Sequence, residues 1–243
     1  IPTEDGGKNL LNHPISDEPI PIEDALNILE KNVDTIGLNP ASGGHLGYIP
    51  GGGIFPTALG DYLAAVTNRY AGIYFGGPGA VRVENMLIRW MCSVMGYHET
   101  ASGNLASGGS IGNLIAIVTA RDFKKIEPHV IPKSVIYLTS QVHHCVQKAI
   151  RISGLNQAQT TYIPVDENFK MDLNELRKQI QKDIAEGKKP FLLIGSAGTT
   201  DVGAVEPLND LADIAEEFNL WFHVDAAYGG FFMLTDQGKE KMK

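Results

Sequence analysis

One segment joins an acidic residue to an apolar run and to several small residues. Residues 221–230 read WFHVDAAYGG, so Asp225 closes a stretch that is typical of a buried strand. A carboxylate that leaves water needs a cationic or hydrogen-bonding partner, and a ligand with a protonated ring nitrogen would be one. Ala226 and Ala227 leave space beside the carboxylate for a flat molecule. A structural Asp that caps the next turn would have the same surroundings, so this segment alone leaves both interpretations open.

A glycine-rich turn at residues 106–113, ASGGSIGN, directly precedes a predicted helix. Gly108 and Gly109 allow the backbone to approach a ligand closely, and Ser110 adds a hydroxyl donor. The N-terminus of the helix offers unpaired N–H groups and the positive end of the helix dipole. Together these features suit a phosphate group. An ordinary capped turn has the same composition, and a Gly-Ser turn alone is a weak signal.

Two further turns carry polar residues. His143 and His144 follow a predicted strand, and one imidazole could stack on a planar ring or act in acid–base chemistry. A pair of histidines that caps a helix is the simpler explanation in isolation. We expect no metal site, because neighbouring helical histidines point in different directions and no second ligand cluster is suitably spaced. Thr200 lies in the polar turn 198–203, GTTDVG, which an ordinary strand-to-helix connection would also contain.

Alternating strand and helix patterns after residue 100 must position these turns. Strands are predicted at 134–139, 160–164, 191–195 and 220–225, and helices at about 110–125, 143–152, 172–185 and 206–218. This alternation predicts an α/β fold with a mainly parallel sheet wrapped by helices. Ligands of such sheets bind where strands end and helices begin, which is where the polar turns lie.

The first 99 residues have a different pattern. Residues 1–21 hold several prolines and predict an extended arm, and the glycine-rich stretch 39–53 contains Tyr48 and predicts a shaped loop. Helices are predicted at 23–36, 57–70 and 81–95. We therefore divide the chain into an N-terminal arm and helical segment, 1–99, and an α/β domain, 100–243. The apolar helices and the arm have no sheet of their own to cover, which predicts a homodimer interface.

Composition argues against several classes of partner. The 243 residues include 20 Lys and Arg against 28 Asp and Glu, a net charge of −8, and contain no basic run. Neither nucleic acid nor an anionic membrane is an expected partner of such a chain. No apolar run is long enough to span a bilayer. Two cysteines are too few for a disulfide framework and indicate a reducing, cytoplasmic setting.

With these motifs in order, the chain resembles the pyridoxal-phosphate-dependent group II amino-acid decarboxylases. This family includes the aromatic-L-amino-acid, histidine, glutamate and diaminobutyrate decarboxylases. The run HVDAAYGG at 223–230 resembles the cofactor-holding strand end of the family, and the other three turns match in order and approximate spacing. The stretch GYIP at 47–50, and Pro78 with Glu84, extend the resemblance to about residues 37–235. The resemblance implies the large domain of fold-type I enzymes, with pyridoxal 5′-phosphate as cofactor.

The resemblance also implies a role for each motif. Asp225 would pair with the pyridinium nitrogen and keep the ring protonated, so that the ring withdraws electrons. His143 would stack on one face of the ring, and the methyl group of Ala227 would pack against the other. Thr200 would lie near the ring. The residues implied as the phosphate cradle are Gly108, Gly109 and Ser110.

Substrate contacts follow from the same resemblance. Tyr48, Ile49 and Pro50 resemble the loop that lines the substrate pocket, and Tyr74 resembles an aromatic residue contributed across the dimer interface. Ile49 stands where aromatic-selective members often carry a ring, and Arg82 replaces a carboxylate of the usual pattern. The resemblance therefore does not determine which side chain the amino-acid substrate carries.

The implied reaction is decarboxylation of an L-amino acid to the amine and CO2. The Schiff-base lysine of the family follows an Asp-x-His or Asn-x-His pair beyond the position of Asp225, and Lys239, Lys241 and Lys243 lack that context. We therefore expect this chain to be the N-terminal part of the enzyme, with a companion polypeptide as one source of the lysine. Two alternatives stay open: another carbon–carbon lyase or aldehyde-forming reaction on the same scaffold, and a non-catalytic fragment.

Overall fold

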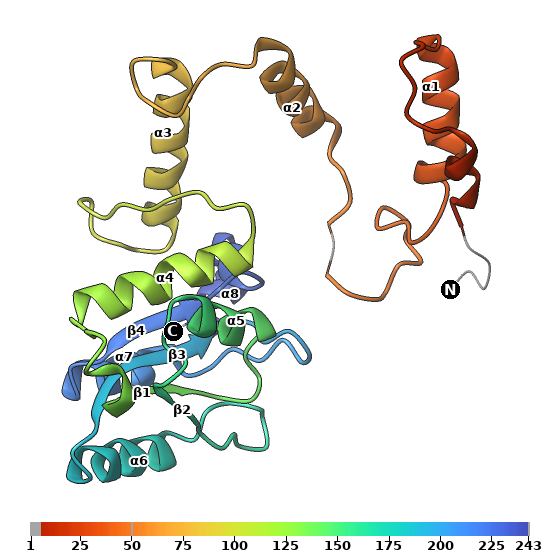
Figure 1. The fold of residues 1–243 in the computed structure, drawn as a ribbon. Coiled ribbons are helices and arrows are strands. Elements are labelled where there is room, and N and C mark those ends of the chain that lie inside the picture. Colours follow the sequence, from red (N-terminus) through yellow and green to blue (C-terminus); the bar gives the residue numbers. More distant parts are fainter. Residues whose placement is uncertain (1–5, 50, 243) are drawn as a thin grey trace. The chain divides into compact units, whose positions relative to one another are not determined.

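The computed structural model describes residues 6–49 and 51–242. Contacts between residues divide the chain into two compact units, Ile1–Gly72 and Ile73–Lys243. The second unit contains a four-stranded sheet and the helices that cover it (Figure 1). The division into 1–99 and 100–243, which rests on expected roles, remains a prediction.

The sheet has the order β2–β1–β3–β4, and every neighbouring pair of strands is parallel. The strands are β1 (Ser134–Leu138), β2 (Gln159–Tyr162), β3 (Lys189–Ser196) and β4 (Trp221–Asp225). The predicted α/β fold with a parallel sheet is therefore confirmed. In the register of β3 and β4, Ser196 lies opposite Asp225, so the two strands end side by side.

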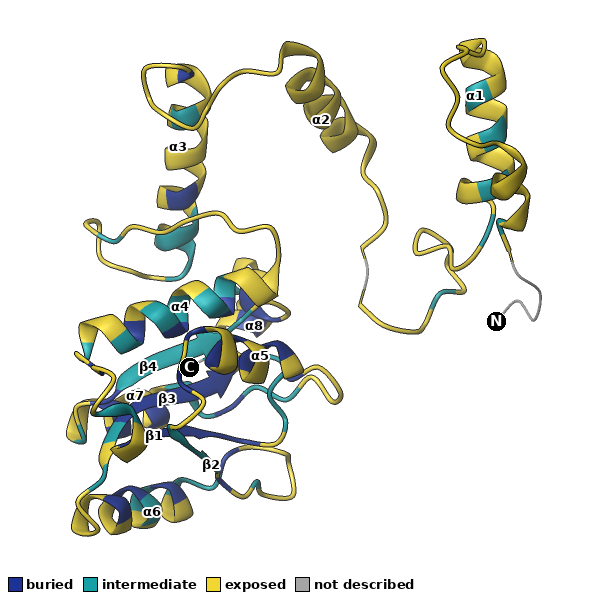
Figure 2. Ribbon diagram, viewed as in Figure 1, coloured by how far each residue is buried: buried dark blue, intermediate teal, exposed yellow. Residues whose placement is uncertain are grey.

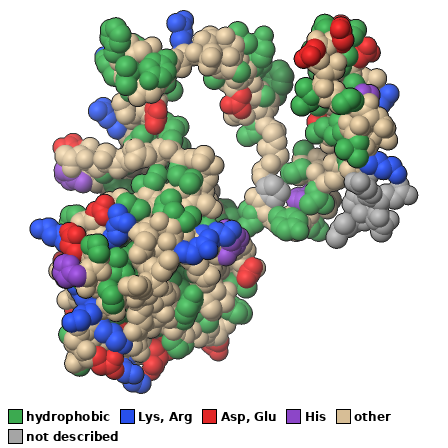
Figure 3. Space-filling model, viewed as in Figure 1, with side chains coloured by type: hydrophobic (Ala, Val, Ile, Leu, Met, Phe, Trp, Pro, Cys, Tyr) green, Lys and Arg blue, Asp and Glu red, His purple; other side chains and the backbone are tan. Residues whose placement is uncertain are grey.

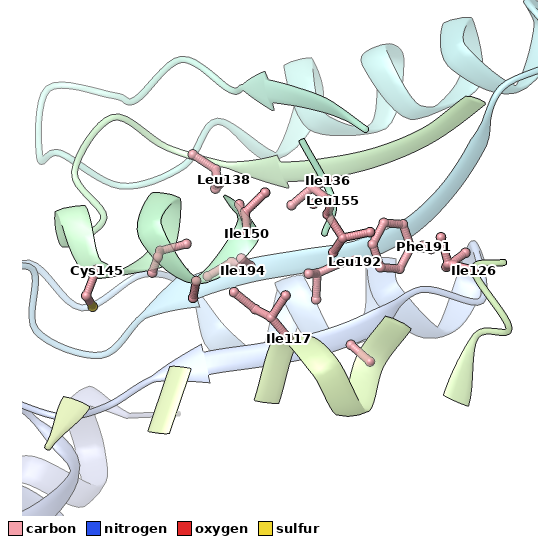
Figure 4. Packing of buried hydrophobic residues seen from close by; sticks show 13 residues of the cluster. Ile117, Ile126, Ile136, Leu138, Cys145, Ile150, Leu155, Phe191, Leu192 and Ile194 are labelled. Atoms are coloured by element: carbon pink, nitrogen blue, oxygen red, sulfur yellow. The ribbon is translucent and has the colours of Figure 1, made fainter. Parts of the chain in front are cut away.

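Helices cover both faces of the sheet. They are α4 (Gly109–Phe123), α5 (His144–Ile152), α6 (Leu173–Ala185) and α7 (Leu208–Glu217). One core cluster joins α4 and α5 to residues of β1 and β3 that alternate along the strands except at the consecutive pair Phe191 and Leu192, among them Ile136 and Ile194 (Figure 4). A second cluster joins α6 and α7 to the residues between, such as Tyr137 and Leu193. This alternation follows from the two-residue period of a strand.

Burial differs between central and edge strands. All of β1 and most of β3 are buried, as expected for strands covered on both faces (Figure 2). Every residue of β4 is only half-buried, so the expectation that Asp225 would be largely desolvated is too strong. The reason is that β4 lies at an edge of the sheet in this chain.

The N-terminal helices are α1 (Ile22–Leu29), which continues as a π-helical turn at Glu30–Asp34, α2 (Phe55–Thr67) and α3 (Pro78–Val94). The first predicted helix, 23–36, thus changes type partway. The extended arm expected at 1–21 is wrong in part, because Lys8–Asn12 form a 3₁₀ helix. Its i→i+3 bonds, such as Leu10 N–H to Gly7 O at 2.9 Å, are local and leave no periodic apolar pattern.

The second unit includes α3 and a short C-terminal helical segment. Trp90 of α3 stacks on Phe231 with 6.4 Å between ring centroids. Phe231 belongs to a 3₁₀ helix, Gly230–Leu234, which is followed by α8 (Asp236–Lys241). Neither helical segment was expected from the sequence. The α8 helix depends on a local cap, in which Thr235 Oγ1 accepts the N–H of Gly238 at 3.0 Å.

Candidate functional site

The carboxylate of Asp225 lies at the carboxyl end of β4, and N–H donors contact both of its oxygens. The backbone N–H of Ala227 donates to Oδ1 at 3.1 Å, and the side-chain amide of Asn113 donates to Oδ2 at 3.1 Å. The backbone carbonyl of Asp225 accepts the N–H of Ala197 at 2.9 Å, which ties the end of β4 to the end of β3. The carboxylate is therefore held in one orientation at the sheet edge.

The glycine turn meets this carboxylate through α4. Gly108 is the N-cap residue of α4 with φ 149° and ψ 168°, a backbone conformation that L side chains rarely adopt. The first hydrogen bonds of the helix run from the N–H groups of Ile111 and Gly112 to Gly108 O. The N–H groups of Gly109 and Ser110 lie before these bonds, at the end of the helix where N–H groups have no acceptor within the helix itself. A Cβ atom placed on Gly109 would lie 3.7 Å from Ala227 Cβ. The glycine turn and the Asp225 segment thus face each other.

His143 is the N-cap residue of α5, so the helix-cap interpretation of this histidine holds. Its Nδ1 accepts the backbone N–H of Cys145 at 3.2 Å. Because Nδ1 is an acceptor, the neutral ring carries its proton on Nε2. The ring lies 4.0 Å from that of His144 between centroids. The pKa of His144 is lowered first by coulombic repulsion between the two imidazoles, and then by desolvation and by Lys148.

The N-terminus of α5 also lies beside Asp225. Asn113 Nδ2 is 3.5 Å from the sulfur of buried Cys145. Burial raises the pKa of the Cys145 thiol, and the Asp225 carboxylate raises it further. The structure therefore brings the His143 turn, the 108–110 turn and Asp225 to one place.

The turn at 198–203 leaves β3 next to Asp225. Thr199 is buried and its Oγ1 accepts the N–H of Ala204 at 3.0 Å, whereas Thr200 is exposed. Gly198 has φ 96°, and a Cβ there would lie 2.6 Å from Tyr228 Cδ1. The turn is thus built closely against the residues that follow Asp225.

The expected substrate residues are placed less completely. Tyr48, with φ 62°, and Ile49 are exposed residues of the first unit, and Pro50 lies outside the described residues. Tyr74 belongs to the second unit, and its hydroxyl accepts hydrogen bonds from Arg82 Nε at 3.0 Å and Nη2 at 2.6 Å. The guanidinium group of Arg82 is thereby hydrogen-bonded to the hydroxyl of Tyr74. The roles of these residues toward a substrate remain predictions.

Asn113, His223 and Glu206 are polar residues near the site to which sequence reasoning assigned no role. Asn113 and Glu206 are buried, with exposed fractions of 4% and 1%, and His223 is half-buried. Asn113 sits one helical turn after Gly109, and that spacing is the one signal that pointed to it. His223 looks like an ordinary member of an apolar strand, and Glu206 like a loop residue.

Two features of the described residues bear on other functions. Within residues 6–49 and 51–242, no group of three His, Cys, Asp or Glu side chains is arranged to hold a metal ion. None of the helices in the same ranges has the length and apolar character that crossing a membrane requires.

The arrangement can hold a flat ligand with a negative and a positive end. The N-terminus of α4 offers N–H groups to an anion. The oriented carboxylate of Asp225 offers a negative charge to a cationic ring nitrogen. The imidazole of His143 and the methyl group of Ala227 are available to contact a ring.

Known proteins match this chain over nearly its whole length. The model of the pyridoxal-dependent decarboxylase conserved domain matches residues 8–243. An aromatic-L-amino-acid decarboxylase of Bacillus atrophaeus is 32% identical over 236 residues, which are 97% of this chain and 49% of that protein. The chain spans about half or less of the length of the curated relatives it matches.

Two solved structures are similar in fold as well as in sequence. One is the glutamate decarboxylase domain of a diaminobutyrate-pyruvate transaminase and L-2,4-diaminobutyrate decarboxylase from Vibrio parahaemolyticus, with a TM-score of 0.91 and 25% identity, covering 98% of this chain and 54% of that one. The other is the tryptophan decarboxylase of Catharanthus roseus in complex with L-tryptophan, with a TM-score of 0.90 and 25% identity, covering 100% of this chain and 54% of that one.

Proposed function

The chain belongs to the pyridoxal-dependent decarboxylase family, and on that premise we propose that the protein carrying it converts an L-amino acid to the amine and CO2 with pyridoxal 5′-phosphate as cofactor. The observation that carries this proposal is the Asp225 carboxylate. It is held by Asn113 and Ala227 beside the glycine turn of α4 and the N-terminus of α5. We assign no particular amino acid as substrate.

The residues at this edge of the sheet fit the cofactor. Its phosphate requires N–H donors and a positive potential, which the N-terminus of α4 supplies. The backbone of Gly108, with φ 149°, would be strained by a side chain, so the turn stays open to a ligand. The protonated ring nitrogen requires an anion, which is Asp225. When bound, the cofactor supplies an electron sink for the electron pair that the departing carboxyl group leaves behind.

In this proposal each side chain has a defined task. Asp225 keeps a proton on the ring nitrogen by pairing with its positive charge. His143 would cover one face of the ring and Ala227 would contact the other, so the two side chains would fix the orientation of the ring in the site. Thr200, which is exposed, lies on a turn able to approach the ring. The residues that would bind the phosphate are Gly108, Gly109 and Ser110.

We also propose a homodimer and a substrate loop. Large apolar side chains are exposed along α1, α2 and α3 (Figure 3), which is the surface expected of a chain that pairs with another.

Tyr48, Ile49 and Pro50 would line the substrate pocket, with Tyr74 contributed across the interface. The free cysteines Cys92 and Cys145 agree with a reducing, cytoplasmic setting.

Product analysis tests the proposal. The protein that carries this chain is titrated with pyridoxal 5′-phosphate while its absorbance is followed, and is then incubated with a panel of L-amino acids. We expect saturable cofactor binding and equal amounts of amine and CO2 from at least one amino acid. An aldehyde as the main product would support the alternative chemistry on this scaffold. Absence of cofactor binding would overturn the proposal.

A further inference from the structure

Asn113 of α4 makes polar contacts with the first turn of its own helix and with two other elements, β4 and α5. Its Nδ2 lies 2.9 Å from Gly109 O, 3.1 Å from Asp225 Oδ2 and 3.5 Å from Cys145 Sγ. Its Oδ1 lies 2.8 Å from His223 Nε2. The side chain is buried, with an exposed fraction of 4%. A single amide therefore connects the glycine turn, the end of β4 and the start of α5, whose residue Cys145 belongs to the core cluster (Figure 4).

The orientation of this amide is determined by its partners. Gly109 O and Asp225 Oδ2 are both acceptors, so the atom that faces them must be the N–H-bearing nitrogen. A flipped amide would place its oxygen against a carbonyl and a carboxylate. Asn113 Oδ1 must then face His223, and the short contact requires a proton on His223 Nε2.

His223 is suited to keep that proton. It precedes Asp225 by two residues on β4, so both side chains project from the same face of the strand. Burial lowers the pKa of His223 more than the nearby Asp225 carboxylate raises it. The imidazole is therefore neutral at neutral pH, with its one proton on the nitrogen that faces Asn113.

We propose that His223 and Asn113 form a positioning relay, in which His223 orients the Asn113 amide and the amide orients the Asp225 carboxylate toward the cofactor nitrogen. The relay also sets the spacing between that carboxylate and the phosphate turn, because the same nitrogen donates to Gly109 O. This inference rests on the proposed function. Neither Asn113 nor His223 is a catalytic residue in it, since both act through Asp225.

The alternative is that the amide merely joins α4 to β4, and substitutions distinguish the two. His223→Gln places an amide nitrogen at about the position of imidazole Nε2 and retains a donor, whereas His223→Leu removes the donor at similar volume. Asn113→Ala removes the relay altogether. Thr119→Ala, at an exposed position of the same helix, is the matched control.

The readouts are the dissociation constant of pyridoxal 5′-phosphate, the pH titration of its absorbance on the protein, and the thermal midpoint. We expect Asn113→Ala and His223→Leu to weaken cofactor binding about tenfold or more, the effect of losing a hydrogen bond to a charged group. Their cofactor spectra should change with pH in a range where the wild-type spectrum is constant. His223→Gln and Thr119→Ala should bind as the wild type does.

Three results would contradict the relay. Wild-type affinity and spectra in both Asn113→Ala and His223→Leu would overturn it while leaving the proposed function intact. Equal loss of affinity in His223→Gln and His223→Leu would assign His223 a packing role only, and this pair decides the matter if Asn113→Ala does not fold. Failure of the wild-type protein itself to bind pyridoxal 5′-phosphate would overturn the proposed function and the relay with it.

Discussion

Asp225 is the residue on which the proposed chemistry depends, and its charge can be removed with little change in shape. Asp225→Asn leaves the backbone bond from Ala197 to residue 225 in place, so we expect the fold to persist. The rate of amine formation should fall by at least about hundredfold, because the preorganised negative charge that keeps the ring nitrogen protonated is lost. Steady-state kinetics measure the rate, and circular dichroism checks the fold. Turnover equal to that of the wild type would remove the basis of the proposal.

Glu206 is a buried acid close to the same edge of the sheet. Thr139 Oγ1 donates to its Oε1 at 3.2 Å, and the Ser196 N–H donates to its Oε2 at 3.3 Å. Burial raises the pKa of Glu206 to about 7, although both hydrogen bonds lower it. Thr139 Oγ1 in turn accepts the N–H of Gln141 in the turn that leads to His143. Glu206 therefore joins the ends of β1 and β3 beneath the candidate site.

This raised pKa predicts a dependence of stability on pH. Between pH 4.5, the ordinary value of a Glu, and about 7 the folded state binds more protons than the unfolded state. The contribution of Glu206 to the free energy of unfolding should thus be highest below this range and fall by up to about 3 kcal/mol as pH rises through it. Glu206→Gln, which imitates the protonated acid, should flatten this dependence. Urea unfolding from about pH 4.5 to about pH 8 measures it.

The control for Glu206 is Glu216→Gln, which makes the same charge change at an exposed position of α7. The variant at 216 should retain the wild-type dependence of stability on pH. If the free energy of unfolding of Glu206→Gln changes with pH as that of the wild type does, another titratable group is responsible for the change.

At the scale of elements, the ends of β3 and β4 are joined by a contact that only a glycine permits. A Cβ on Gly229 would lie 2.0 Å from Ala197 O and 2.8 Å from Ala197 C. These are backbone atoms of the segment whose N–H pairs with the Asp225 carbonyl at 2.9 Å. Any side chain at 229 must therefore push the two strand ends apart.

Gly229→Ala should lower the free energy of unfolding by about 1–3 kcal/mol or more, the usual cost of overpacking, and should weaken cofactor binding through the displaced Asp225. Denaturant unfolding and cofactor titration measure the two effects. Gly60→Ala is the control, because a Cβ there meets nothing within 4 Å in α2. That variant should be stabilised by about 0.5–1 kcal/mol. Equal effects at the two positions would contradict the steric explanation.

At the scale of the whole molecule, large apolar side chains are exposed to an extent that is unusual for a monomeric protein. Leu59, Leu63 and Val66 lie on one face of α2 and are 48%, 59% and 63% exposed. Along the described part of α2 no residue is buried. Contiguous apolar surface of this kind marks interaction sites, in agreement with the proposed homodimer.

Light scattering tests the homodimer. We expect the protein to have the mass of a dimer at micromolar concentration, and the double substitution Leu59→Glu and Leu63→Glu to shift it toward the monomer, because charges are costly in an apolar interface. Gln181→Glu, which adds a charge at an exposed position of α6, should leave the dimer unchanged. A monomeric wild-type protein would contradict the prediction.

The amino-acid sequence alone predicts the α/β architecture and the places of the polar turns. Apolar periodicity reports the burial of each element, and all four predicted strands occur as β1–β4 with closely similar ends. Short helices such as Lys8–Asn12 and Asp236–Lys241 escaped prediction, because local caps and i→i+3 bonds leave no periodic pattern. The motif residues Gly108, His143 and Asp225 were identifiable because each lies at a strand or helix end.

Which residues meet at the site depends on how the elements pack in three dimensions. Asn113 and Asp225 are 112 residues apart along the chain, and Asn113 and His223 are 110 apart. No local pattern encodes such a contact, since it depends on the order in which parallel strands pair and on the helix packed over them. The same holds for Glu206, whose burial beneath the ends of β1 and β3 decides its pKa. Sequence identifies groups able to do chemistry, and packing determines their distances, partners and protonation.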